Sequence, residues 1–293
     1  MSSSGVGSLV SRFASSAVSL SMATSTTAAE SSASMAAAPS SVATAADSDG
    51  AESGHTELAK QLSNPVANLI SVPVQSNFDF GYGTADEGFR MTINVQPVIP
   101  ITLNESWNLI TRTILPIIYQ DDVPAPGESK FGLGDTLLSL FASPASTEPF
   151  IWGLGPVLML RTDTSPVLGT EKWGIGPTGV LLKQAGPITF GALANHIWSV
   201  AGNDERADVS STFLQPFFAY TLPSATTLTV NSETSYDWEG KQWLVPVNLM
   251  AAQLLAPGGQ PLQVQAGVRY YLESPDGGPD WGLRLAVTLL FPK

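Results

Sequence analysis

The sequence predicts an all-β fold: a transmembrane up-and-down antiparallel β-barrel of about twelve strands. Three observations favour it. Segments of about a dozen residues recur between clusters of Gly, Pro, Asp and Ser, which suits a tilted membrane-spanning strand of ~9–11 residues better than a soluble strand of ~5–6. The seven Trp residues stand near the ends of these segments, where an indole can bury its ring and keep its N–H in water. Apolar and polar residues alternate in the clearest segments.

Composition narrows the classes of function. Asp and Glu number 25 against 13 Lys and Arg, so the chain lacks the positive surface that nucleic acid binding requires. The absence of Cys excludes disulfides and thiolate metal sites, and two His residues are too few for a multi-His site. No apolar run approaches the ~20 residues of a membrane-spanning helix. We therefore expect no metal, no cofactor and no nucleic acid partner.

The first part of the chain predicts targeting rather than a packed domain. Residues 1–29 are rich in Ser, Ala and Thr, with Arg12 as their only base and a small-residue stretch ending at Ala29. We interpret them as a signal or targeting segment, either for bacterial export or for an organelle. Residues 30–56 predict a disordered leader. Residues 57–67, which include Pro65, predict a short periplasmic helix, and residues 68–293 the barrel.

Twelve strand-like segments follow in order. They are residues 68–82, 88–103, 106–120, 131–143, 149–162, 172–184, 187–201, 209–222, 225–238, 242–255, 261–272 and 281–293. An even number of strands is the rule for bacterial outer-membrane barrels. Segments 131–143 and 149–162 show no clear alternation, so their faces are not assigned.

Charged residues fall in the middle of the polar faces. In the last segment Leu285 and Phe291 share one face, whereas Arg284 lies on the other. An Arg that faces lipid at mid-depth would cost about 2–4 kcal/mol, so we expect such residues to face the lumen. The candidate lumen and selectivity residues are Arg112, Lys183, Glu233, Arg269, Glu273 and Arg284. Their mixed signs fit two alternatives, a narrow selective channel or a scaffold locked shut by ion pairs.

The turns predict the orientation. Every second turn is acidic, and the turns between are mostly shorter and poorer in acid, which is the asymmetry of long outer loops and short periplasmic turns. The predicted aromatic girdle is Trp173, Trp198, Trp238, Trp243 and Trp281 at the outer rim, with Trp107 and Trp152 at the inner rim. Both chain termini are then periplasmic.

Other motifs are assigned structural roles. His196 and Ser199 lie three residues apart on a strand, so they face opposite sides and do not form a catalytic pair. The glycine-rich stretches 132–135 and 174–179 precede no helix, which argues against nucleotide binding. Prolines in the middle of strands predict bulges in the wall. They are Pro73, Pro97, Pro116, Pro156, Pro216 and Pro246.

Several stretches resemble a bacterial outer-membrane β-barrel family catalogued as transporters. They are residues 58–65, 69–73, 94–100, 107–120, 131–135, 172–177, 192–198, 213–217 and 246–249. The family is related to the barrel proteins named after the MetA pathway of phenol degradation, and some members are misnamed neuromedin U. The resemblance implies a barrel and the uptake of a small compound, aromatic compounds included, and supplies no binding residues.

The sequence therefore predicts a passive channel or transporter for a small solute in the bacterial cell outer membrane, without enzymatic activity. The alternative is a non-transporting structural or recognition barrel. The expected partners are outer-membrane lipid, the barrel-assembly machinery and the solute.

Overall fold

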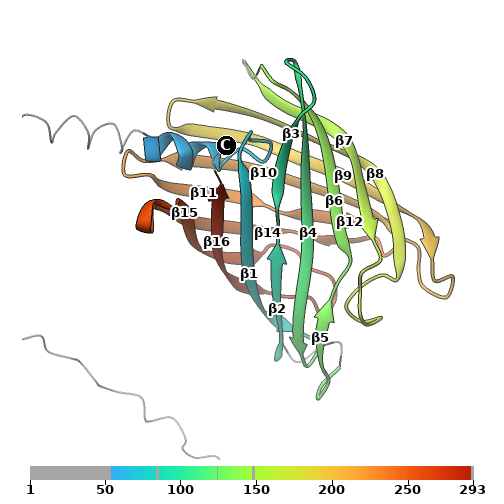
Figure 1. Cartoon of the computed structure of the whole chain (residues 1–293). Helices are drawn as coiled ribbons and strands as arrows, with labels where there is room; N and C mark the ends of the chain where they lie inside the picture. The colour runs from blue at the N-terminus through green and yellow to red at the C-terminus, as the bar shows by residue number, and fades with distance from the viewer. Residues whose placement is uncertain (1–53, 84–85, 124, 147–148, 292–293) are drawn as a thin grey trace, which may run out of the picture. The chain divides into compact units, whose positions relative to one another are not determined.

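The computed structural model describes residues 54–83, 86–123, 125–146 and 149–291 (Figure 1). The predicted targeting segment, 1–29, and all but the last three residues of the predicted leader, 30–56, lie outside the described residues. Residues 54–61 form a helix, and η1 (Pro257–Gly259) is one turn of 3-10 helix. No helix in these described ranges is long and apolar enough to cross a membrane.

Twelve antiparallel strands form the wall. Eight are unbroken: β1 (Ile70–Tyr82), β4 (Trp107–Asp121), β7 (Ile151–Leu160), β8 (Lys172–Ala185), β9 (Ile188–Gly202), β10 (Ser210–Thr221), β15 (Leu262–Tyr271) and β16 (Trp281–Phe291). Four are each interrupted once: β2 (Gly88–Val95) with β3 (Val98–Thr102), β5 (Ser129–Leu133) with β6 (Thr136–Pro144), β11 (Thr226–Ser232) with β12 (Thr234–Asp237), and β13 (Gln242–Leu244) with β14 (Pro246–Leu255). These positions match the twelve predicted segments closely.

The sheet closes on itself. The first strand, β1, pairs with the last, β16, from Ile70 opposite Phe291 to Phe80 opposite Trp281. On the other side β10 pairs with both β11 and β12. Every strand therefore has two neighbours, which removes the exposed edges that an open sheet would leave. The predicted barrel fold is confirmed.

The two rims differ. The terminal rim carries Ile70 and Phe291, the first residue of β1 and the last of β16, and the helix 54–61 lies at this end of the barrel (Figure 1). The far rim carries the connections 161–171, 203–209 and 272–280.

Apolar side chains cover the outside of the wall. On β16, Leu283 and Leu285 are exposed, whereas Arg284 between them is only 1% exposed and faces inward. On β6 and β7, however, the inside is apolar as well: Phe141 and Val157 are fully buried. Apolar residues on both faces explain why the segments 131–143 and 149–162 show no alternation.

The mid-strand prolines distort the wall in part as predicted. Pro97 lies in the break between β2 and β3, and Pro246 begins β14 directly after a break. Pro156 and Pro177 lie opposite each other on β7 and β8. At the level of these prolines, residue pairs are missing from the pairing of β7 with β6 and from the pairing of β8 with β9. Because proline has no N–H to donate, these gaps follow from its chemistry. Pro73, Pro116 and Pro216 instead lie within unbroken strands.

Candidate functional site: the barrel lumen

The lumen contains a cavity of about 520 Å³. Inward side chains of the barrel strands form its walls, and residues 61–69, which connect the helix to β1, contribute to its lining from the terminal rim. Its lining mixes amides, hydroxyls, apolar groups and three charged groups. The volume falls within the ~300–1,000 Å³ of small-molecule sites.

The segment 54–69, which we call the N-terminal segment, packs inside the terminal rim. Ala59 is fully buried in a cluster with wall residues from the last strands, including Leu254 and Leu290. Side-chain hydrogen bonds tie the helix to a turn of this rim and to the end of β8. Thr56 Oγ1 donates to the carbonyl of Pro223 at 2.8 Å, and Gln184 Nε2 donates to the carbonyl of Lys60 at 3.0 Å.

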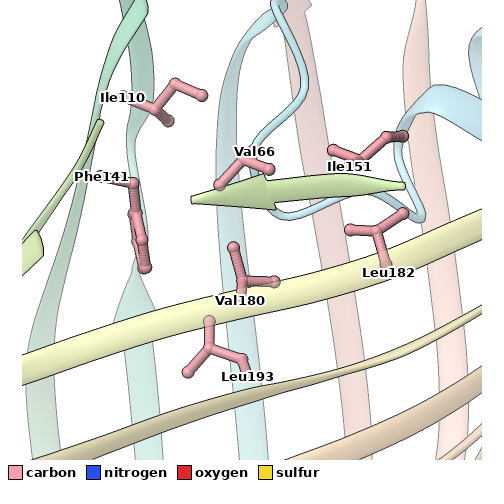
Figure 2. Close-up of a cluster of buried hydrophobic side chains, with 7 residues drawn as sticks. All are labelled: Val66, Ile110, Phe141, Ile151, Val180, Leu182 and Leu193. Atoms are coloured by element: carbon pink, nitrogen blue, oxygen red, sulfur yellow. The ribbon is translucent and has the colours of Figure 1, made fainter. Parts of the chain in front are cut away.

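Val66 anchors the same segment to the opposite side of the wall. It packs in an apolar cluster with side chains from β4, β6, β7, β8 and β9 (Figure 2). The wall members of the cluster are Ile110, Phe141, Ile151, Val180, Leu182 and Leu193. The N-terminal segment is thus held by apolar burial on both sides, together with the hydrogen bonds at Thr56 and Lys60.

A charged network occupies the wall between β1 and β12. Arg284 Nη1 and Nη2 donate to the two carboxylate oxygens of Glu233 at 2.8 and 2.7 Å, and Arg284 Nε donates to Asn77 Oδ1 at 2.8 Å. Two parallel hydrogen bonds between a guanidinium and a carboxylate fix both groups in direction as well as distance. Because Arg284 is buried, this pairing is what makes its charge tolerable inside the barrel.

Arg269 links Glu233 to a second carboxylate. Its Nη2 lies 3.7 Å from Glu233 Oε2, and its Nη1 lies 3.6 Å from Asp79 Oδ2. Tyr271 donates its hydroxyl to Asp79 Oδ1 at 2.9 Å. Each carboxylate of this network is therefore shared among several donors.

Glycines provide the room for these long side chains. Gly282 lies between Asp79 and Arg269 in the cross-strand register, and Gly267 lies between Arg284 and Met250. A Cβ at Gly267 would stand 2.6 Å from Met250 Cγ, and one at Gly282 would overlap the Asp79 carboxylate. Both positions require a residue without a side chain.

Arg112 lies across the lumen from this network, and Glu233 attracts its charge without a direct ion pair. It lies on β4, halfway around the barrel from Glu233, and its Nη2 donates to Gln96 Oε1 at 3.0 Å. None of the ion pairs formed by the described residues includes Arg112. Its guanidinium lines the cavity with an amide as its hydrogen-bond partner.

The structure places four of the six candidate lumen residues inside the barrel and two elsewhere. Arg112, Glu233, Arg269 and Arg284 face inward. Lys183 is a correction: it shares the outer face of β8 with exposed Leu181, and its Nζ lies 5.5 Å from the centre of the Phe150 ring.

Glu273 is the second correction. The strand β15 ends at Tyr271, and Glu273 lies beyond it, exposed at the far rim. Glu273 was assigned to the lumen because the sequence does not show that the strand ends before it. Lys183 was assigned there because alternation alone does not show which face of a strand is the inner one. Conversely, Asp79 is absent from the predicted lumen residues. The residue alternates with Phe78 and Phe80 along the strand, and this pattern indicates an acid that faces the lumen.

The predicted girdle residues all point outward. The five assigned to the outer rim lie at the far-rim ends of their strands, and Trp107 and Trp152 lie at the terminal rim with ring centres 5.8 Å apart. At the far rim Tyr236 contacts both Trp238 and Trp243. Their role at a membrane surface stays a prediction.

His196 and Ser199 face opposite sides of β9, as expected. His196 Nδ1 lies 2.7 Å from Thr212 Oγ1 on the outer face, beside the Trp198 ring. Ser199 Oγ donates to Asp208. Across the described ranges, no group of three or more His, Asp or Glu side chains is placed to hold a metal ion.

Ionisable groups also join the connections of the far rim. Asp135 Oδ2 accepts hydrogen bonds from the backbone N and the hydroxyl of Thr170 at 2.6 and 2.7 Å. Asp163 stands beside Asp135, and loss of hydration together with a hydrogen bond between the two carboxyl groups raises the pKa of Asp163. Lys172 and Ser199 donate to Asp208 and lower its pKa.

One of the solved structures that match this chain shows the same fold. An outer membrane channel from Pseudomonas putida matches with a TM-score of 0.60 and 15% identity, over 76% of this chain and 96% of its own. The outer membrane phospholipase A of Escherichia coli matches with a TM-score of 0.46 and 11% identity, over 76% of this chain and 90% of its own. The first likeness supports the barrel architecture alone.

No family model matches the sequence, and no curated protein matches it either. The resemblance to the MetA-pathway family therefore stays a prediction.

Proposed function

We propose that this protein is a passive conduit for a small solute across the bacterial outer membrane, closed at its periplasmic rim by the N-terminal segment. The observation that carries the proposal is the cavity of about 520 Å³, which lies inside a closed barrel and is lined at one end by residues 61–69. Transport would be diffusion through the lumen, with the lining side chains setting selectivity and no chemical step.

The exterior supports a membrane location. An exposed band of Leu, Val, Ile and Phe side chains would be unfavourable in water, and lipid removes that cost. Trp residues end this band at both rims, where indoles favour a membrane–water interface. With the termini in the periplasm, the N-terminal segment is periplasmic and the acidic loops face outward.

The size of the barrel supports a gated conduit. Barrels of about eight strands are filled by their own side chains, whereas those of about sixteen leave a wide aqueous channel. Twelve strands fall between these cases, and here the lumen is partly filled by the N-terminal segment. Continuous passage then requires that segment to move, which would break the hydrogen bonds at Thr56 and Lys60 and the apolar contacts of Ala59 and Val66.

An engineered disulfide that fixes the N-terminal segment to the wall, and that can be reduced again, tests this function. Val66→Cys and Gly153→Cys are suited to a disulfide because an ideal Cβ at Gly153 lies 3.5 Å from Val66 Cγ1, and the chain has no other Cys. In planar bilayers the oxidised double variant should conduct less than the wild type, and reduction should restore conductance. Each single variant is the control and should not respond to reductant.

The alternative, a non-transporting structural or recognition barrel, predicts a different result. In that case neither the wild type nor the reduced variant conducts, although both fold into heat-modifiable barrels. The ion pairs and apolar cluster inside the lumen are the features that favour this alternative.

A further inference from the structure

The charges that line the cavity do not balance. Its ionisable lining residues are Arg112, Arg284 and Glu233. Glu233 already accepts two hydrogen bonds from Arg284 and lies within ion-pair distance of Arg269. The cavity therefore offers no uncommitted carboxylate to a cation. The guanidinium of Arg112 is attracted by Glu233 across the lumen but forms no direct ion pair among the described residues, so its remaining N–H groups are open to an anion.

The surroundings of Arg112 are suited to a carboxylate. An Arg guanidinium has five N–H donors in a planar fork, and here one of them reaches Gln96 Oε1. Asn94 and Gln96 also line the cavity and supply amide groups beside it. A bound carboxylate would gain charge-assisted hydrogen bonds in surroundings where little water competes.

This side of the cavity combines apolar side chains with uncharged polar ones. The polar residues are Ser139, Asn195, Ser211 and Gln215. The apolar lining includes Ile114, Leu137, Ile197, Phe213 and Phe217, from β4, β6, β9 and β10. Arg112 is the one charged lining residue on these strands, because Glu233 and Arg284 belong to the opposite wall. A ligand here would have a single charged end and an apolar body.

We propose that the cavity binds a small organic monocarboxylate, with its carboxylate on Arg112 and its apolar body against Phe213 and Phe217. This inference deepens the proposed conduit by naming its solute class, and it rests on that function only for the route by which the ligand reaches the cavity. The volume accommodates a molecule of about ten to twenty heavy atoms, since sites of this size hold ligands up to drug size.

Calorimetric titration of the full chain in lipid nanodiscs tests the proposal with three matched probes. They are 4-phenylbutyrate, its neutral amide and 4-phenylbutylammonium. The wild type should bind the carboxylate about tenfold or more tightly than the amide, because hydrogen bonds to a charged acceptor are stronger than those to a neutral one. It should not bind the ammonium measurably. Equal binding of carboxylate and amide, or no binding of the carboxylate, overturns the proposal.

Variants distinguish the contribution of the ligand's carboxylate to binding from that of its apolar part. Arg112→Gln should reduce carboxylate binding to the level of the amide, and Lys183→Gln, which removes a cation from the outer face, should change nothing. Phe217→Ala should weaken carboxylate and amide alike. If Arg112→Gln folds, as shown by heat-modifiable migration, and still prefers the carboxylate, Arg112 does not hold it.

Binding and conduction are measured on the same preparations, so their failures are distinguishable. A barrel that binds 4-phenylbutyrate through Arg112 but never conducts contradicts the conduit and leaves the site. A barrel that conducts without discriminating among the three probes contradicts the site and leaves the conduit.

Discussion

Arg284 on β16 reaches Glu233, between β11 and β12, over the two strands that separate them. Their two hydrogen bonds, at 2.8 and 2.7 Å, pass above β14 and β15 inside the lumen. At the height of Arg284, β15 carries Gly267, so the guanidinium meets no side chain on its nearest neighbouring strand. The ion pair thus ties together strands that are distant around the wall.

This arrangement predicts that Gly267→Ala destabilises the barrel. The new Cβ would stand 2.5 Å from the carbonyl oxygen of Leu249 and 2.6 Å from Met250 Cγ. Overpacking of this kind costs about 1–3 kcal/mol, measurable by urea unfolding of the barrel in liposomes. Ala266→Val, one residue away on the outer face, is the control and should change the free energy of unfolding by less. Equal effects would show that the lumen side is not crowded.

Removal of one partner of the ion pair should cost more than removal of both. Glu233→Gln leaves Arg284 buried without a carboxylate, and a broken buried pair typically costs about 3–5 kcal/mol. Arg284→Met combined with Glu233→Gln removes both charges, so the double variant should be more stable than the sum of the single losses predicts. Additive losses in the same unfolding assay would mean that the two residues are not coupled.

The backbone amides of the connection 161–171 should become less protected against hydrogen exchange as pH rises. The raised pKa of Asp163 means that the folded state holds this proton more tightly than the unfolded state. Its contribution to stability is therefore fully present below the unfolded value of 3.8 and is lost as pH rises through the folded pKa. Hydrogen exchange of residues 161–171, corrected for its intrinsic pH dependence, should show this trend, and Asp163→Asn should abolish it.

Asp208 should behave in the opposite sense. Its pKa is lowered by hydrogen bonds from Lys172 and Ser199, so its contribution is present above the unfolded value of 3.8 and is lost as pH falls through the folded pKa. Exchange of residues 203–209 should therefore increase on acidification in the wild type. An unchanged acid response in Asp208→Asn would contradict this assignment.

The proposed orientation predicts which turns are accessible on intact cells. Because the chain has no Cys, a single Cys reports its own position. Asp204→Cys, in a connection of the far rim, should react with membrane-impermeant maleimides, and Ser224→Cys, in a turn of the terminal rim, should react only after the cells are lysed. Labelling of Ser224→Cys alone would reverse the orientation.

Much of the architecture was readable from the sequence because strand length and turn residues are local signals. The twelve segments match the observed strands, and Arg269, Arg284 and Glu233 fell on the polar faces that the structure brings together. The partners were not readable, because nothing in the sequence shows that Arg284 pairs directly with Glu233 while Arg112 donates its hydrogen bond to the amide of Gln96. That depends on register and on which strands face each other across the lumen.

Two parts of the candidate site escaped prediction for physical reasons. Val66 carries no motif, and its burial depends on an apolar lumen wall that includes Phe141 and Leu182, where the inside was expected to be polar. The helix spans residues 54–61 rather than 57–67, and residues 62–69 continue as turns along the cavity, since their structure follows from tertiary contacts rather than from local propensity.

Liposome swelling with a Trp placed inside or outside the lumen tests most directly whether solute passes through this barrel. Gln215 lines the cavity, and its neighbour Leu214 faces outward with 45% of its surface exposed. If the lumen is the conduit, Gln215→Trp should abolish most of the flux of 4-phenylbutyrate, and Leu214→Trp should leave it at the wild-type rate. Equal flux through both variants, or no flux through the wild type, would contradict the account.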